Sequence, residues 1–279
     1  MANVQKKHKN TEKGEFYLKA ENDEYFRVVS LSGGKDSTAM LLLMLERNMP
    51  VDLVIWADTT MEFPEMYEHI SKLDEHLYRE RGLHITVLRH PHGFEWMMFD
   101  VSDGIGKKSL DYRLEQNISL TGRGWPNMRN RWCTGFLKAH LINKFSNTLK
   151  GEYKVLHYIG IAADEVHRCK NGQYPLVEWG ITEAQALEIC YDRGFDFGGL
   201  YRIYHRVSCW CCPLQRVDEL RKLRRHHPKL WAHLLDMDER AKAMYGMSVL
   251  GEFKRNWSVE RYDKRFAQEE AQMGMEGGF

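Results

Sequence analysis

One stretch of the sequence decides the fold: Val28-Val29-Ser30-Leu31-Ser32-Gly33-Gly34-Lys35-Asp36-Ser37-Thr38. A short apolar, β-branched run leads into two glycines, and a helix-forming run, 39–46, follows at once. The glycines let the backbone turn tightly and bring N–H groups close to an anion. The helix adds its unpaired amide donors and the positive end of its dipole. This order predicts a phosphate site, with charge from Lys35 and hydroxyl donors from Ser32, Ser37 and Thr38.

The segments that follow repeat the alternation of strand and helix. Apolar runs predict strands over 25–31, 51–57, 83–88 and 154–161, and apolar spacing predicts helices over 38–47, 64–81, 134–149, 182–193, 215–225 and 228–245. We therefore expect an α/β fold with a doubly wound, mostly parallel sheet and ligands at the carboxyl ends of its strands. The stretch 102–131 lacks periodicity and is expected to lack regular structure.

Length and composition fit one large domain with a smaller appended unit. The chain has 279 residues, 43% of them hydrophobic and 28% charged, which is enough apolar material for a sizeable core. It contains no run of 18 apolar residues, and the lysine-rich start, 1–10, lacks the apolar core of a signal peptide. We expect a cytoplasmic protein without a membrane partner. Six cysteines in such a chain indicate thiol or metal chemistry rather than disulfides.

The spelling of the glycine loop identifies its type. Lys35 is followed by Asp36, which excludes a Walker-type loop. The loop instead resembles the PP-loop, Ser-Gly-Gly-x-Asp-Ser, of the adenine nucleotide α-hydrolase superfamily. The resemblance implies that an adenine nucleotide binds to Ser32, Gly33, Gly34, Lys35, Asp36, Ser37 and Thr38.

Three further strings resemble the phosphoadenosine phosphosulfate (PAPS) reductase family, in the same chain order. Asp58-Thr59 with 63–65 is similar to its Asp-Thr-Gly-x-x-Phe-Pro-Glu element, although Thr60 stands where that family carries glycine. The strings 129–138 and 159–168 resemble its Arg-x-Cys-Thr…Lys and Gly-x-x-x-Asp-Glu-x-x-x-Arg segments. The resemblance implies further nucleotide contacts from Asp58, Thr59, Lys138, Gly160, Glu165 and Arg168. The basic side chains in these strings can neutralise phosphate or sulfate oxygens. The predicted catalytic residues are Lys35, Asp36, Arg129 and Arg131.

The sequence 208–213, Ser-Cys-Trp-Cys-Cys-Pro, carries metal-ligand spacing. Cys209 and Cys212 form a Cys-x-x-Cys pair, which lets two thiolates hold one metal or cluster iron. Cys133 lies in a motif that the resemblance places at the nucleotide end of the sheet. We predict a [4Fe-4S] cluster on Cys133, Cys209 and Cys212, with Cys211 as a possible further ligand. A structural zinc with His205 or His157 as fourth ligand, and a thiol-rich core without metal, remain open.

The resemblance divides the chain and suggests its function. We expect a flexible N-terminal segment (1–24), a PP-loop nucleotide-binding α/β domain (25–205), a Cys cluster with a helical extension (206–250) and a frayed tail (251–279). The first functional hypothesis is cleavage of ATP, with Mg²⁺, to AMP and pyrophosphate, which activates a nucleic acid or small molecule for sulfur transfer. The second is reduction of PAPS or adenosine phosphosulfate to sulfite. No cysteine follows Cys212, so the C-terminal nucleophile of thioredoxin-dependent reductases has no counterpart.

The third hypothesis is a non-catalytic protein that binds nucleotide or nucleic acid. Residues 202–229 contain eight Lys or Arg against two acids, although the net charge is only +1. Such a run is either a solvated helix face or a polyanion surface, here for nucleic acid. A sulfur donor such as a cysteine desulfurase, and a second copy of the chain, are the other candidate partners.

Overall fold

The computed structural model describes residues 24–149 and 151–276. Four strands in these ranges form a parallel sheet in the order β3-β2-β1-β4. They are β1 (Tyr25–Leu31), β2 (Leu53–Asp58), β3 (Ile85–Arg89) and β4 (Lys154–Ile159). Parallel neighbours require crossover connections, and α1 (Lys35–Glu46) and α2 (Pro64–Arg81) supply the first two. The α/β fold with a parallel sheet is therefore confirmed.

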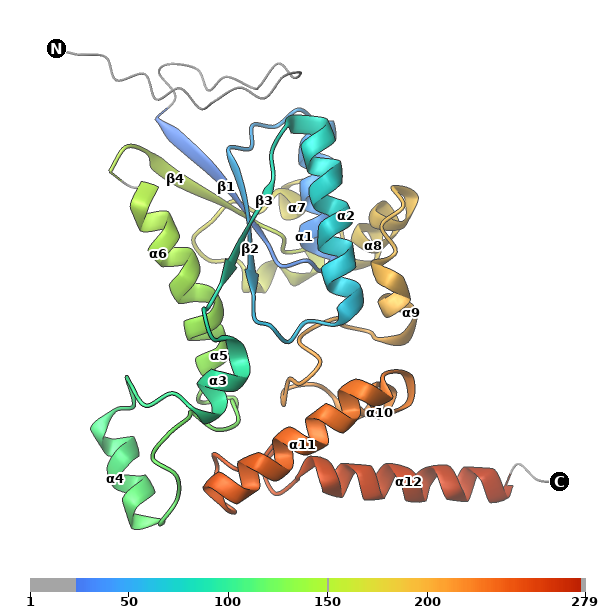
Figure 1. The fold of residues 1–279 in the computed structure, drawn as a ribbon. Coiled ribbons are helices and arrows are strands. Elements are labelled where there is room, and N and C mark those ends of the chain that lie inside the picture. Colours follow the sequence, from blue (N-terminus) through green and yellow to red (C-terminus); the bar gives the residue numbers. More distant parts are fainter. Residues whose placement is uncertain (1–23, 150, 277–279) are drawn as a thin grey trace.

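Helices cover both faces of the sheet. Figure 1 shows α1 and α2 on one side and α6 (His140–Leu149) on the other. Residues 37–45 of α1 are all buried, because the helix lies between the sheet and α8 (Glu183–Asp192). A helix that is apolar all round fits such a central position. The helix begins at Lys35, three residues before the predicted start, with Gly34 in the extended N-cap conformation.

Shorter helical segments join the main elements. They are α3 (Gly93–Phe99), α4 (Lys107–Glu115), α5 (Trp132–Thr134), the π-helical segment η1 (Gly135–Ala139), the 3-10 segment η2 (Ala163–Arg168), α7 (Pro175–Glu178), the 3-10 segment η3 (Phe197–Gly199) and α9 (Leu200–Ile203). The predicted helix 134–149 thus appears as three consecutive segments. The helix predicted from Thr182 is α8, and a capping box between Thr182 and Gln185 fixes its start.

The expectation that 102–131 lacks regular structure is wrong in part, because α4 forms within it. The side chain of Arg113 in this helix is buried and donates to the carbonyl oxygens of Ser119 and Thr121 at 3.2 and 3.0 Å. The helix is therefore tied to the loop that follows it through a polar side chain. A search for apolar periodicity does not detect such an anchor.

The C-terminal part forms three long helices: α10 (Val217–His226), α11 (Pro228–Tyr245) and α12 (Val259–Glu276). The expectation of a frayed tail over 251–279 is wrong for its described residues. Val259, Tyr262 and Phe266 are buried at helical spacing, and Phe266 packs on Trp231 of α11 with ring centroids 5.9 Å apart. Figure 1 places these helices beyond the ends to which the strand arrows point.

The predicted flexible segment 1–24 lies outside the described residues except for Glu24, as do 277–279 of the predicted tail. Within the described ranges, none of the helices has the length and apolar character needed to cross a bilayer.

Candidate functional site

The glycine loop between β1 and α1 is braced by its own hydroxyl groups. Gly33 has φ of +84°, a conformation that side chains rarely adopt, and so turns the chain from strand into helix. Ser37 Oγ accepts a hydrogen bond from the Ser32 amide and donates one to the Gly34 carbonyl, both at 3.1 Å. Thr38 Oγ1 donates to the Gly33 carbonyl at 3.4 Å. The Ser37 and Thr38 hydroxyls therefore stabilise the loop from inside.

Gly160, directly after β4, lies against this loop. A Cβ atom at Gly160 would come within 2.5 Å of Ser37 Cα and 2.6 Å of Ser37 N. Only glycine allows this approach of two backbones. The strand order reverses between β1 and β4, which is where open α/β sheets bind their ligands.

Lys35 stands at the first turn of α1 with its side chain only 11% exposed. Its Nζ lies 3.4 Å from Glu183 Oε2 and 3.6 Å from Asp36 Oδ1. The Lys35 amide donates to the hydroxyl of Tyr201, from α9, at 3.0 Å. Burial raises the pKa of Tyr201, so this hydroxyl keeps its proton and can donate it to an anion at the loop.

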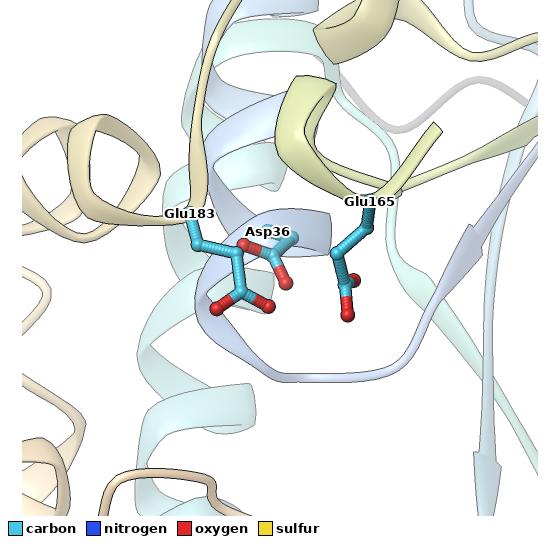
Figure 2. Close-up of side chains that lie close together, drawn as sticks. All are labelled: Asp36, Glu165 and Glu183. Carbon is cyan, nitrogen blue, oxygen red and sulfur yellow. The ribbon is translucent and has the colours of Figure 1, made fainter. Parts of the chain in front are cut away.

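Three carboxylates from separate elements meet beside Lys35: Asp36, Glu165 and Glu183. Each offers an oxygen, and these atoms lie within 4.8 Å of one another. Figure 2 shows the three side chains together, carried by α1, η2 and the start of α8. Burial raises the pKa of Asp36 to about 6, against the attraction of Lys35 and with help from the other two carboxylates. Asp36 Oδ1 is buried and accepts no hydrogen bond from the described residues.

A pocket of about 340 Å³ opens beside the loop, within the usual range for small-molecule sites, roughly 300–1,000 Å³. It is lined by residues that the sequence places far apart. The predicted site residues in its wall are Ser32, Gly34, Lys35, Asp36, Thr59, Arg131, Lys138, Gly160, Arg168, Cys133, Cys209, Cys211 and Cys212.

Six predicted residues do not line this pocket: Gly33, Ser37, Thr38, Asp58, Arg129 and Glu165. The first three shape the loop. Arg129 is exposed outside the pocket. Glu165 belongs to the carboxylate trio and pairs with Arg168.

Asp58 is held by the fold instead of facing the pocket. Its Oδ1 accepts hydrogen bonds from the Thr60 amide at 2.7 Å and the Tyr67 hydroxyl at 3.0 Å. Its Oδ2 accepts from Arg89 Nε at 2.7 Å, and the side chain is fully buried. Both oxygens are occupied, so the structure gives Asp58 a bracing contact between β2, β3 and α2. The sheet order also puts β2 on the side of β1 away from the switch point.

The four pocket cysteines come from two distant segments. Cys133 lies in α5, whereas the other three follow α9 in a turn closed by the Cys212 amide on the Cys209 carbonyl at 3.1 Å. Burial raises the thiol pKa values of Cys209, Cys211 and Cys212. In the described part of the chain, no group of three His, Cys, Asp or Glu side chains that includes a cysteine has its ligand atoms within 4.8 Å of one another.

A polar network joins the cysteines to β2. The Thr59 hydroxyl donates to Glu62 Oε1 at 2.9 Å and lies 3.3 Å from Cys209 Sγ. Cys209 Sγ is 3.4 Å from the same Glu62 oxygen, and Lys138 Nζ is 3.6 Å from it. Burial opposes the charge on Lys138, but the Cys209 and Glu62 side chains outweigh it and raise the pKa of Lys138. A cation, a carboxylate and a thiol thus share one wall of the pocket.

Four polar residues in the wall of the main pocket are absent from the predicted site. They are Glu62, Glu183, Tyr201 and Arg206. Glu62 lies inside the string 58–65 that had been singled out, and Glu183 lies in the first turn of a predicted helix. Tyr201 carries no signal in the sequence, because only the fold brings α9 to the glycine loop.

The basic segment 202–229 is partly neutralised inside the protein. Arg221 Nη2 lies 2.8 Å from Glu269, and Arg224 lies 2.7 Å from Asp263, both acids of α12. The positive charges of Arg221 and Arg224 are therefore neutralised by ion pairs with α12 and do not form part of a free basic surface. Arg206, in contrast, lines the pocket.

The parallel sheet, its order and the glycine loop beside a pocket at the strand ends define the chain as an α/β protein with a candidate ligand site at the switch point of its sheet. Residues 27–112, slightly less than a third of the chain, match the model of the phosphoadenosine phosphosulfate reductase domain.

Two curated relatives come from Methanocaldococcus jannaschii. The uncharacterized protein MJ0066 is 26% identical over 227 residues, which are 73% of this chain and 39% of the relative. The uncharacterized protein MJ0973 is 22% identical over 242 residues, 81% of this chain and 50% of the relative. The chain thus spans half or less of the length of the curated relatives it matches.

Two solved structures resemble this one with low TM-scores and low sequence identity. A PAPS reductase from Candida auris in a phosphate complex has a TM-score of 0.39 and 16% identity, over 67% of this chain and 81% of that one. The U34-tRNA thiolase NcsA from Methanococcus maripaludis, with its [4Fe-4S] cluster, has the same score and identity over 80% of this chain and 73% of that one.

Proposed function

We propose that this protein is a PP-loop enzyme that binds an adenine nucleotide and cleaves ATP to AMP and pyrophosphate, thereby activating an acceptor for sulfur transfer. One observation carries the proposal: a single pocket is lined both by Lys35 and Asp36 of the glycine loop and by four cysteines. Activation by adenylation and delivery of sulfur need these two kinds of group beside the same acceptor.

The triphosphate would lie along the loop, with its charge opposed by Lys35, Arg131 and Arg168, all in the pocket wall. An acceptor oxygen would form a bond to the α-phosphorus while the bond from that phosphorus to the bridging oxygen of the β-phosphate breaks. Pyrophosphate then leaves with the electron pair of that bond, and the acceptor carries AMP. Little covalent chemistry is left to the protein, so positioning and neutralisation of charge account for catalysis.

The carboxylate trio suits a divalent cation that accompanies the nucleotide. Mg²⁺ prefers oxygen ligands and is commonly held by one or two carboxylates plus substrate phosphates. The buried Oδ1 of Asp36, which accepts no hydrogen bond from the described residues and lies 3.6 Å from Lys35 Nζ, fits this use, with Glu165 and Glu183 as its neighbours. When bound, the ion neutralises phosphate charge.

The cysteines suit a [4Fe-4S] cluster better than one zinc ion. A single zinc needs all its donors within one tetrahedral shell, whereas each iron of a cluster takes its own thiolate and the thiolates stand farther apart. The ligand atoms of Cys133, Cys209 and Cys212 do not all lie within 4.8 Å of one another, as the shell of a single zinc ion would require, and this favours the cluster. Cys211 also lines the pocket and is the candidate fourth ligand. A bound cluster supplies iron at which a sulfur species can be held.

The test compares nucleotides on the purified protein. Binding of Mg-ATP and of PAPS is measured by calorimetry, and AMP, pyrophosphate and sulfite are assayed after incubation. Binding of Mg-ATP with release of equal amounts of AMP and pyrophosphate supports the proposal. Preference for PAPS with sulfite release under a reductant would replace it with the second hypothesis, sulfonucleotide reduction. Binding without any product would leave a nucleotide-binding protein.

A further inference from the structure

A second, smaller pocket lies between α4 and the loop at 121–125, and we call it the arginine pocket. Its volume is about 140 Å³, and it is lined by Gly106, Ser109, Arg113, Arg123, Asn130 and two aliphatic side chains. This volume is several times the roughly 10–15 Å³ that one water needs. A small polar group of several atoms can therefore enter it.

Two arginines wall this pocket without a carboxylate partner. Arg113 is only 2% exposed, and it donates hydrogen bonds to two carbonyl oxygens and to the Ser109 hydroxyl. Arg123 is half-buried: its Nη2 donates to the carbonyl oxygens of Asp103 and Gly104 at 3.5 and 3.4 Å, whereas its Nε is buried and donates to no described acceptor. Neither arginine forms an ion pair with an acid of the described residues, and burial together with the neighbouring Arg113 lowers the pKa of Arg123. Two neighbouring cations, Arg113 buried and Arg123 half-buried, repel each other, and an anion between them would relieve this repulsion.

The backbone fixes the position of Arg123. Gly122 and Gly124 on either side have φ of +68° and +64°. A Cβ at Gly122 would lie 2.1 Å from the Tyr245 hydroxyl, and one at Gly124 would lie 2.5 Å from the Leu250 carbonyl oxygen. The segment is thus seated against the C-terminal helices, and Arg123 projects from it at a set place. The geometry is that of a preformed site.

The rim of the pocket adds further donors. Gly106 is the N-cap of α4, and no side chain caps this helix. The Ser109 amide already donates to the Gly106 carbonyl at 2.9 Å, so the amides of Lys107 and Lys108 are the first-turn donors left for a ligand. Lys107 and Lys108 follow Gly106 and are exposed. The nine-residue helix therefore places its positive end beside Gly106 at this pocket.

One short loop separates the arginine pocket from the main pocket. Asn130 lines the former, and the next residue, Arg131, lines the latter. The loop is closed by hydrogen bonds from the Arg129 and Asn130 amides to Asn127 Oδ1, both at 3.0 Å. Arg123 also stacks on Phe136 of η1, with its guanidinium carbon 4.1 Å from the ring centre. A ligand in one pocket is thus a near neighbour of a ligand in the other.

We propose that the arginine pocket binds a phosphate group. Paired guanidinium forks match phosphate oxygens in shape and charge. If the protein has the function proposed above, this phosphate belongs to the acceptor, whose reacting atom enters the main pocket. Only this assignment of the phosphate to the acceptor rests on the proposed function. Its source is then either the backbone of a nucleic-acid strand or a smaller phosphorylated molecule, and the two are separated by experiment.

The experiment uses the whole chain without ATP, so that its result does not depend on turnover. Fluorescence anisotropy follows labelled single-stranded DNA and RNA oligonucleotides, and thermal unfolding follows stabilisation by inorganic phosphate. Arg123→Gln is expected to weaken oligonucleotide binding roughly tenfold and to lower the salt slope by about one. Arg79→Gln, an exposed arginine of α2, is the matched control and should leave both measurements unchanged.

Each outcome decides a point. Weaker binding of both probes by Arg123→Gln supports a nucleic-acid source. Lost stabilisation by inorganic phosphate with unchanged oligonucleotide binding supports a smaller phosphorylated molecule. Equal behaviour of Arg123→Gln and the wild type toward both probes overturns the proposal. If Arg123→Gln does not fold, the exposed rim variant Asn130→Asp replaces it, because a carboxylate there repels phosphate and should give the same losses. Failure of ATP cleavage in the earlier test leaves this result standing.

Discussion

Lys35 and Asp36 show how neighbouring residues acquire different tasks from their surroundings. Lys35 lies between two carboxylates, which hold its ammonium at the pocket. Asp36 is held among like charges, and its Oδ1 accepts no hydrogen bond from the described residues. Lys35 thus presents a neutralised cation, and Asp36 presents a carboxylate that is costly to ionise unless a cation besides Lys35 joins it.

Lys35→Ala should lower the rate of AMP formation from ATP by about 10²–10³-fold, the usual effect of removing one preorganised charge. The matched control is Lys144→Ala, because Lys144 is exposed on α6, away from the pocket. Rates are measured by pyrophosphate release, and folding by circular dichroism. A folded Lys35→Ala variant with wild-type turnover would remove Lys35 from the proposed chemistry.

Asp36→Asn tests whether ionisation of Asp36 beside Glu165 and Glu183 destabilises the folded protein. The native pKa of Asp36 is raised from 3.8 to about 6, so the folded state holds this proton more tightly than the unfolded state. Asp36 therefore lowers the free energy of unfolding as pH rises from about 4 to 6, and the loss is complete above that window. Without divalent cations, the gain in stability from Asp36→Asn should be about 2 kcal/mol larger at pH 7 than at pH 4.

Urea denaturation at the two pH values measures this difference. Asp236→Asn is a suitable control, because this carboxylate is exposed on α11 and lies outside the trio. A pH-independent effect of Asp36→Asn would mean that the carboxylate is not strained.

At the scale of elements, α12 is the clearest departure from the sequence prediction. Its apolar residues Val259, Tyr262 and Phe266 do have helical spacing, but the charged residues between them obscure it. The acids of the same helix pair with Arg221 and Arg224 of α10. The sequence shows basic residues in α10 and acidic residues in α12, but only the packed structure shows that they form ion pairs with each other.

Phe266→Ala should lower the free energy of unfolding by about 3–5 kcal/mol, because the ring is fully buried. Gln268→Ala, on the exposed side of α12, is the control and should change stability by less than about 0.5 kcal/mol. Both are measured by thermal and chemical denaturation. If the two substitutions had equally small effects, α12 would not pack on the rest of the protein.

Most strands and helices could be predicted from the sequence, because the period of apolar residues reports local structure directly. The role of Asp58 could not, since a carboxylate after a strand suits a ligand as well as a brace. Only the positions of Tyr67 and Arg89 decide between them. Tyr201 and Glu62 were missed for the same reason. The convergence of the four cysteines on one pocket follows the prediction, whereas their occupation by a cluster remains a proposal.

At the scale of the whole molecule, a cluster bound by the pocket cysteines would connect α5, which carries Cys133, to the turn after α9, which carries the other three. Anaerobic reconstitution with iron and sulfide should raise the melting temperature of the wild type, because a ligand that binds only the folded state stabilises it. Cys133→Ser should lower the bound iron and the gain in melting temperature. Cys169→Ser, outside the pocket, should lower neither. Iron and labile sulfide are assayed chemically, and a wild type that stays colourless after reconstitution would exclude the cluster.

The central place of β1 has a consequence for biosynthesis. This strand pairs with β4 more than a hundred residues later in the chain, and the pocket wall extends from Ser32 to Leu214. Ribosomes add about 5–20 residues per second, so the glycine loop emerges roughly ten to forty seconds before the last part of its pocket. During that interval the nascent chain has a phosphate loop but no enclosed site. Nucleotide can therefore be recruited to the completed pocket only after nearly the whole α/β unit has been made.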